Sequence, residues 1–126
     1  MERTVQAEIR RMDPAAEFAT DERCFIVELS NIPSDPEVSI ARARVAADVT
    51  TEWHALTDIT ERYVILEGLG LVEIGALAAT EVGPGDVVLI PPGCRQRITN
   101  VGHSDLIFLA ICSPRFRQSA YRRLEE

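Results

Sequence analysis

The chain has 126 residues, of which 46% are hydrophobic and 26% are charged, and its formal net charge at pH 7 is −7. This length and composition predict one globular domain with a core of its own. No run of about 18 or more apolar residues is present, which excludes a membrane-spanning helix. The acidic balance argues against nucleic acids and anionic membranes as partners, because both attract positively charged surfaces.

The residue types exclude several further classes of chemistry. All 13 basic residues are arginines, so Schiff-base chemistry and a lysine general base are excluded, whereas an arginine could still recognise a carboxylate or a phosphate. Cys24, Cys94 and Cys112 are an odd number of cysteines without a CxxC pair, which argues against a disulfide framework. The charged first residues lack the apolar core of a signal peptide, so we expect a cytoplasmic protein.

The first half of the chain predicts an arm followed by two strands. Residues 1–23 form the arm, in which 13–18 read either as a helical turn or as a segment laid on a partner subunit. Residues 24–29 predict a strand that ends at the turn residues Asn-Ile-Pro-Ser-Asp-Pro. Residues 37–46 alternate with a period of two and predict a second strand. Its Arg42 and Arg44 share one face, which is either solvated or, if it turns inward, able to recognise an anionic substrate.

The second half predicts a series of short strands separated by turns. Strands are expected at 61–67 and 71–74 around a hairpin turn at 68–70, then at 87–90, 94–99 and 105–112. Such spacing indicates an all-β sandwich or barrel over residues 24–114. In the tail, 115–126, Phe116, Ala120 and Leu124 recur at helical spacing, which predicts a short C-terminal helix packed on the barrel.

Two segments carry a recognisable pattern. Residues 54–68 read H-A-L-T-D-I-T-E-R-Y-V-I-L-E-G, and residues 85–100 read G-D-V-V-L-I-P-P-G-C-R-Q-R-I-T-N. They resemble the two motifs of the cupin superfamily, and the chain is similar to small single-domain bacterial cupins often described as mannose-6-phosphate-isomerase-like. The resemblance covers roughly residues 37–114. It implies a cupin double-stranded β-helix, that is, a jelly-roll barrel, and it implies pairing into homodimers.

The resemblance also implies a site inside the barrel. It places His54, Glu61 and Gln96 around one point as ligands of a divalent metal ion (Fe, Mn, Ni or Zn). If the protein is an enzyme, the candidate catalytic residues are Glu61 and Tyr63, with Cys94 as an alternative to Tyr63 for proton transfer. Two ligand positions depart from the family pattern, because Leu56 and Gln96 stand where histidines are expected. Loss of ligands weakens metal binding, so the alternative is that no metal binds.

Each of these residues also has a purely structural interpretation. His54 could be a satisfied or surface histidine, Glu61 a solvated strand end, and Gln96 a polar residue facing solvent. Tyr63 could pack in the core with a hydrogen-bonded hydroxyl. Cys94 reads as a small core residue or as a further ligand near Gln96.

Three functions remain open on the sequence alone. The first is a metal-dependent isomerase, lyase or dioxygenase acting on a small oxygenated or carboxylate-bearing substrate. The second is a barrel that binds a sugar or an organic acid without catalysis. The third is a metal-free enzyme that uses Glu61 for acid–base chemistry, with a pKa raised by the apolar barrel. All three require a small-molecule ligand and no nucleic acid or membrane partner.

Overall fold

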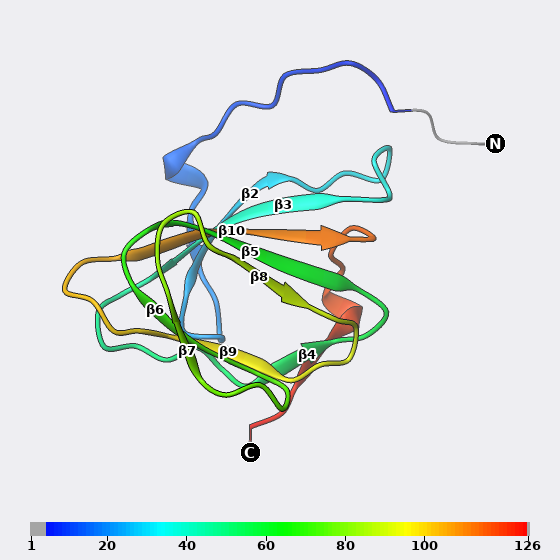
Figure 1. Cartoon of the computed structure of the whole chain (residues 1–126). Coiled ribbons are helices and arrows are strands. Elements are labelled where there is room, and N and C mark those ends of the chain that lie inside the picture. The colour runs from blue at the N-terminus through cyan, green and yellow to red at the C-terminus, as the bar shows by residue number, and fades with distance from the viewer. Residues whose placement is uncertain (1–4, 126) are drawn as a thin grey trace.

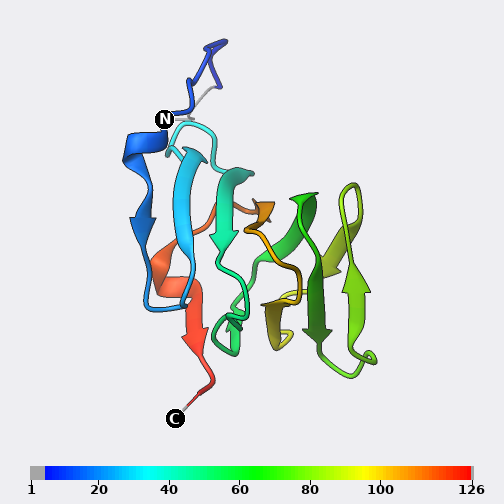
Figure 2. The same cartoon turned by 90° about the vertical axis from the view of Figure 1, so that its left-hand side faces the viewer.

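A computed structural model describes residues 5–125 and shows two antiparallel sheets that face each other as a barrel (Figures 1 and 2). The larger sheet has the strand order β1-β2-β3-β10-β5-β8. Its strands are β1 (Phe18–Ala19), β2 (Phe25–Ser30), β3 (Ser39–Val45), β10 (Leu106–Ser113), β5 (Thr60–Glu67) and β8 (Val87–Ile90). This architecture confirms the predicted all-β barrel.

The smaller sheet has the strand order β11-β4-β9-β6-β7 and forms the opposite wall. Its strands are β11 (Tyr121–Arg123), β4 (His54–Leu56), β9 (Gln96–Asn100), β6 (Gly70–Ile74) and β7 (Thr80–Val82). The predicted strands of the second half are therefore present, with bounds shifted by one or two residues. Three strands of three residues, β4, β7 and β11, were not predicted, because such short strands carry too little periodicity to be recognised.

Alternating side chains build the core between the two sheets. On β5, Glu61, Tyr63 and Ile65 are buried while the residues between them are more exposed, and on β9 Gln96, Ile98 and Asn100 are buried in the same way. Successive side chains on a strand point to opposite faces, so one face of each strand enters the barrel. Burial therefore assigns these residues to the inner face of the barrel.

Gly68 shows why one turn of the barrel requires glycine. It has a φ of +88° between β5 and β6, a conformation that residues with a Cβ atom rarely adopt. A Cβ atom at this position would lie 2.8 Å from the backbone oxygen of Asp105. The hairpin predicted at 68–70 is therefore fixed both by backbone conformation and by the close approach of the loop before β10.

The N-terminal arm contains the helical turn that was one of its two interpretations, whereas the C-terminal tail differs from the sequence prediction. Within the arm, η1 (Pro14–Ala16) is the helical turn, capped by the Asp13 side chain, and β1 pairs with the edge of β2. The helix predicted over 115–126 is wrong for residues 115–125, and residue 126 lies outside the described residues. A 3-10 turn, η2 (Gln118–Ala120), is followed by β11, which pairs with β4. Among residues 5–125, no helix is long and apolar enough to cross a membrane.

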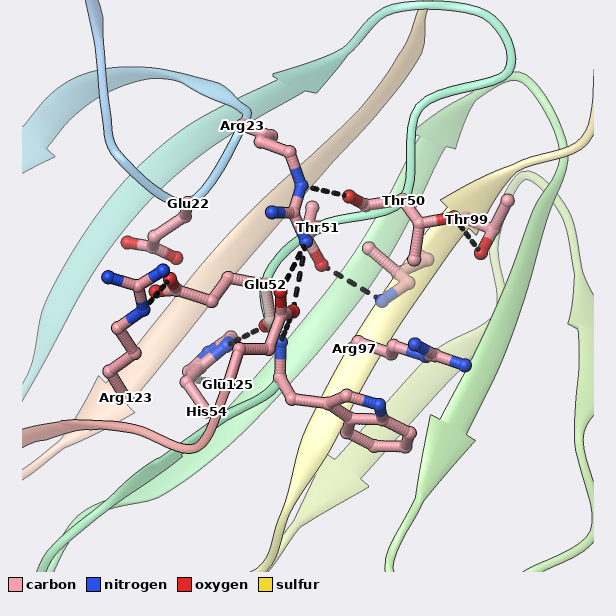
Figure 3. A network of polar contacts seen from close by, with 12 residues as sticks. Glu22, Arg23, Thr50, Thr51, Glu52, His54, Arg97, Thr99, Arg123 and Glu125 are labelled. Carbon is pink, nitrogen blue, oxygen red and sulfur yellow. Dashed lines mark hydrogen bonds and ion pairs between the residues drawn. The ribbon is translucent and has the colours of Figure 1, made fainter.

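Side-chain contacts explain why the tail forms a strand. The Arg123 guanidinium contacts the buried carboxylate of Glu52 at 2.6 Å, and the Tyr121 hydroxyl donates to the same carboxylate at 2.5 Å. The Glu125 carboxylate accepts from the backbone N–H of Trp53 at 2.6 Å and from Arg23 (Figure 3). These contacts outweigh a helical periodicity of only three apolar residues, because isolated helices of this length are marginal.

Candidate functional site

A cavity of about 150 Å³ lies inside the barrel. The larger sheet contributes β2, β3, β5 and β10 to its wall, and β4 contributes from the smaller sheet. Residues of the N-terminal arm and of the C-terminal tail complete the lining, so both ends of the chain help to enclose it. The residues discussed below that line it are Phe18, Glu22, Cys24, His54, Glu61, Tyr63, Phe108, Cys112, Phe116 and Tyr121.

Glu61 is the buried acid of this cavity, with only 8% of its surface exposed. It lies on β5 opposite Cys112 of β10, whose thiol is 3.7 Å from Oε2, while Oε1 has no hydrogen-bond partner. Burial raises the pKa of Glu61 to about 7, and the Gln96 amide and the Cys112 thiol partly offset this rise. A carboxyl group in this state can both accept and donate a proton near neutral pH.

Tyr63 and Gln96 connect the two sheets beside Glu61. The Tyr63 hydroxyl on β5 donates to the side-chain oxygen of Gln96 on β9, and both residues are buried. The Gln96 amide nitrogen has no partner with good hydrogen-bond geometry, yet it lies close enough to Glu61 to lower the pKa of that carboxyl group. The Tyr63 hydroxyl thus fixes the orientation of the amide, and the amide favours the ionised form of Glu61.

His54 approaches the cavity from the smaller sheet, where it pairs with Gln96 across β4 and β9. Its Nδ1 lies 2.8 Å from the backbone carbonyl of Glu52. A carbonyl can only accept, so Nδ1 carries the proton and Nε2 remains as the acceptor of the neutral ring. The Tyr121 ring stacks on the imidazole at a centroid distance of 4.9 Å, and burial lowers the pKa of His54, which keeps the ring neutral.

Sequence reasoning missed the acidic residue Glu22 and the aromatic residue Tyr121. Glu22 comes from the arm, where nothing in the local pattern distinguishes it from other charged residues, and it lines the cavity. Burial, with a smaller contribution from the nearby carboxylates of Glu61 and Glu52, raises the pKa of Glu22 to about 7. Tyr121 was missed because the sequence predicts a helix, not a strand, for the tail.

A third lining residue, Cys112, lies on the inward face of β10. The alternation of that strand with a period of two could have indicated it.

Three residues considered from the sequence lie away from the cavity. Cys94 is half-buried after β8 and is not part of the lining. Arg42 and Arg44 face outward, where both contact Glu17 of the arm, Arg44 at 2.6 Å and Arg42 at 3.5 Å. The solvated interpretation of this strand face is therefore the one that the structure supports, and these arginines do not reach a ligand inside the barrel.

The donor groups do not fit the metal site that the motif positions suggest. Within residues 5–125, no three histidine, cysteine or acidic side chains gather closely enough to hold an ion. The oxygen of Gln96 already accepts from Tyr63, and Leu56 provides no donor atom. His54 and Glu61 remain as two possible ligands, fewer than the three or more protein ligands of a typical catalytic metal site.

Solved structures that resemble this chain share its fold. A Streptomyces protein described as a nucleoside dehydratase matches with a TM-score of 0.75 and 13% identity, over 94% of this chain and 92% of the other. A Klebsiella pneumoniae protein with a double-stranded β-helix domain matches with a TM-score of 0.72 and 12% identity, over 89% and 88%.

An oxalate decarboxylase from Lactobacillus farciminis matches with a TM-score of 0.73 and 19% identity, over 86% of this chain and 33% of that enzyme. No curated protein sequence matches this chain. The family model of the cupin domain matches residues 42–112, which is more than half of the chain. That segment contains β4, β5 and β9, the strands that carry His54, Glu61 and Gln96. The chain belongs to the cupin family.

Proposed function

We propose that this protein is a metal-independent enzyme of the lyase or isomerase type, which moves a proton on a small molecule bound in the barrel. The observation that carries the proposal is the Oε1 atom of Glu61, which is buried at the cavity and has no hydrogen-bond partner. An unpaired buried polar atom costs free energy, so such atoms are rare outside functional sites. A substrate that offers a proton to Oε1 would satisfy it.

In this proposal the Glu61 carboxylate accepts a proton from a substrate carbon. In an isomerase, the carboxyl group returns that proton to a neighbouring carbon. In a lyase that removes water, the same proton passes to the departing hydroxyl, which leaves as water, and the carboxylate is regenerated. His54 accepts a hydrogen bond from a substrate hydroxyl at Nε2 and orients it, while Tyr63 and Gln96 hold Glu61 in place.

The similar Streptomyces structures add support from chemistry of the same type. They include that protein with uridine in a variant in which a histidine is replaced by glutamine, and in two variants in which a tyrosine is replaced by phenylalanine. A dehydratase removes water, which is a lyase reaction. In the present chain, the cavity brings one histidine and two tyrosine side chains, His54, Tyr63 and Tyr121, to one place.

The first test is proton exchange at carbon. Wild-type protein is incubated in D₂O with a panel of small hydroxyl-bearing compounds, and NMR follows deuterium incorporation and loss of water. For any compound that reacts, Glu61→Gln should slow the reaction by about 10²–10⁴-fold, the usual contribution of a general acid–base group. Glu67→Gln, an exposed change at the end of the same strand, serves as the matched control.

The pH dependence gives a second signature. Since the carboxylate is the reactive form, kcat/KM should rise with pH through the pKa of about 7 of Glu61. A reaction that is unchanged in Glu61→Gln would disprove the role of this residue. Activity that disappears with a chelator and returns with one divalent ion would instead support the metal-dependent alternative.

A second candidate is a binding protein without catalysis. The apolar part of the cavity lining favours it, because an apolar cavity with a few convergent polar groups is also the usual form of a binding pocket. Compounds that raise the melting temperature but show no deuterium exchange and no turnover over days would favour this candidate.

A further inference from the structure

The cavity differs from the rest of the molecule in how its negative charges are compensated. Elsewhere, several carboxylates that take part in the fold have an arginine partner. These pairs are Glu17–Arg44 at 2.6 Å, Glu52–Arg123 at 2.6 Å, Glu73–Arg97 at 2.7 Å and Glu125–Arg23 at 2.9 Å. Glu22, Glu28 and Glu61 line the cavity without any ion pair among the described residues, and no arginine is part of the lining.

Glu61 provides the strongest evidence that the negative charge of the cavity is available to a ligand. It is more than nine-tenths buried, lines the cavity and leaves Oε1 unpaired. Glu22 enters the same cavity from the arm, and its side chain makes no hydrogen bond within residues 5–125. In Figure 3, Glu22 lies on the side of the network that holds the Glu52–Arg123 pair, whose charges already compensate each other. Glu22 and Glu61 therefore repel each other.

The remaining walls of the cavity are rich in aromatic rings. Five of the seven aromatic residues of the chain line it, namely Phe18, Tyr63, Phe108, Phe116 and Tyr121. The faces of aromatic rings carry partial negative charge and attract ammonium groups. Carboxylates and aromatic rings, with no arginine among them, form a surrounding that favours a cation and repels an anion. His54 is the basic side chain of the lining, and burial lowers its pKa, which keeps the ring neutral.

We propose that the cavity binds molecules that carry a protonated amine and rejects carboxylates and phosphates. Glu22 anchors the ammonium group, the aromatic rings cover the apolar part of the molecule, and Glu61 lies beside it for proton transfer. The inference deepens the proposed function because it names the chemical class of the substrate. It rests on the proposed function in one respect only, namely that the bound amine is the substrate of the reaction. A carboxylate-bearing substrate would instead add a further negative charge to this space.

Three probes of nearly the same shape test the charge preference directly: benzylammonium, benzyl alcohol and benzoate. Their affinities are measured by titration calorimetry at pH 8, where Glu22 and Glu61, with pKa values of about 7, are mainly ionised. We expect benzylammonium to bind at least about tenfold more tightly than benzyl alcohol, the size of effect that one charge-assisted contact gives. Benzoate should show no binding.

Substitutions of single acidic residues show which side chain causes the preference for benzylammonium. Glu22→Gln should reduce the affinity for benzylammonium to about that for benzyl alcohol, and the affinity for benzyl alcohol itself should not change. Glu81→Gln, an exposed change of the same charge on β7, should leave all three affinities as in the wild type. At pH 7, benzylammonium binding should also release protons, because a cation lowers the pKa of both acids. Titrations in buffers of different ionisation enthalpy measure this release.

The outcomes separate this inference from the proposed function. Equal binding of benzylammonium and benzyl alcohol, tighter binding of benzoate, or no binding of benzylammonium at millimolar concentration would each overturn the amine preference. None of these results depends on turnover. If amines bind as expected but Glu61→Gln leaves every deuterium exchange rate unchanged, the amine preference stands and the proposed proton transfer fails.

Discussion

At the scale of single residues, a short chain of contacts controls the acid of the cavity. The Tyr63 hydroxyl fixes the Gln96 amide, and the amide counteracts the rise in the pKa of Glu61 that burial causes. Tyr63 was expected from the sequence either as a catalytic residue or as a core residue with a bonded hydroxyl. Since its hydroxyl is occupied by Gln96, the contacts favour a positioning role, in which Tyr63 acts through Glu61.

Tyr63→Phe tests this role. The ring is retained and still packs on Phe108, whose centroid is 4.4 Å away, but Gln96 loses its partner. We expect the midpoint of the Glu61 titration, measured by NMR of the carboxyl carbon, to move to higher pH, because the amide is no longer oriented. A loss of stability of about 1–3 kcal/mol should accompany the shift, as for other buried groups left without a partner.

Tyr121→Phe is the matched control for this change. It removes the same atom from a hydroxyl that donates to Glu52 and makes no contact with Gln96. The Glu61 midpoint should therefore stay in place. Equal midpoints in wild type and Tyr63→Phe would show that Tyr63 is only a packing residue.

At the scale of elements, the C-terminal strand closes one end of the barrel. β11 pairs with β4, and Glu52, which is only 3% exposed, depends on Arg123 and Tyr121 for its partners. The same segment brings Tyr121 over His54. Formation of the cavity and docking of the tail are thus coupled, because the tail supplies both part of the wall and the contacts that neutralise a buried carboxylate.

Arg123→Ala should destabilise the fold by about 1–3 kcal/mol, because it leaves the Glu52 carboxylate with less compensation. Urea denaturation measures this loss. Arg122→Ala is the control, since Arg122 is an exposed neighbour on β11 for which no ion pair is seen in the described part of the chain. Equal destabilisation by both changes would indicate that β11 contributes only backbone pairing.

At the scale of the whole molecule, the outer surface keeps apolar side chains in contact with water. Val5, Ile9 and Met12 of the arm are 63%, 81% and 45% exposed, and Val87 and Leu89 of β8 are 62% and 61% exposed. β8 is also an edge strand of the larger sheet. Exposed apolar residues near a sheet edge are typical of surfaces that another chain covers.

The homodimer expected from the sequence remains a prediction. Light scattering at micromolar concentration should give about twice the chain mass of 14.0 kDa. Leu89→Arg on the outer face of β8 should shift the equilibrium toward monomer, because a charge would be buried in the interface. A wild-type mass equal to that of one chain would contradict the prediction.

The sequence by itself determined the barrel, because alternation with a period of two and glycine and proline turn signals are local properties. The spacing that resembles a family pattern also singled out His54, Glu61 and Gln96, and strand alternation added Tyr63 beside Glu61. The fold brings these four residues to one region. Only the tertiary structure decided the environment of these residues. Glu22 and Tyr121 come from opposite ends of the chain. Ion pairing, burial and pKa depend on such distant neighbours, and no local pattern records them.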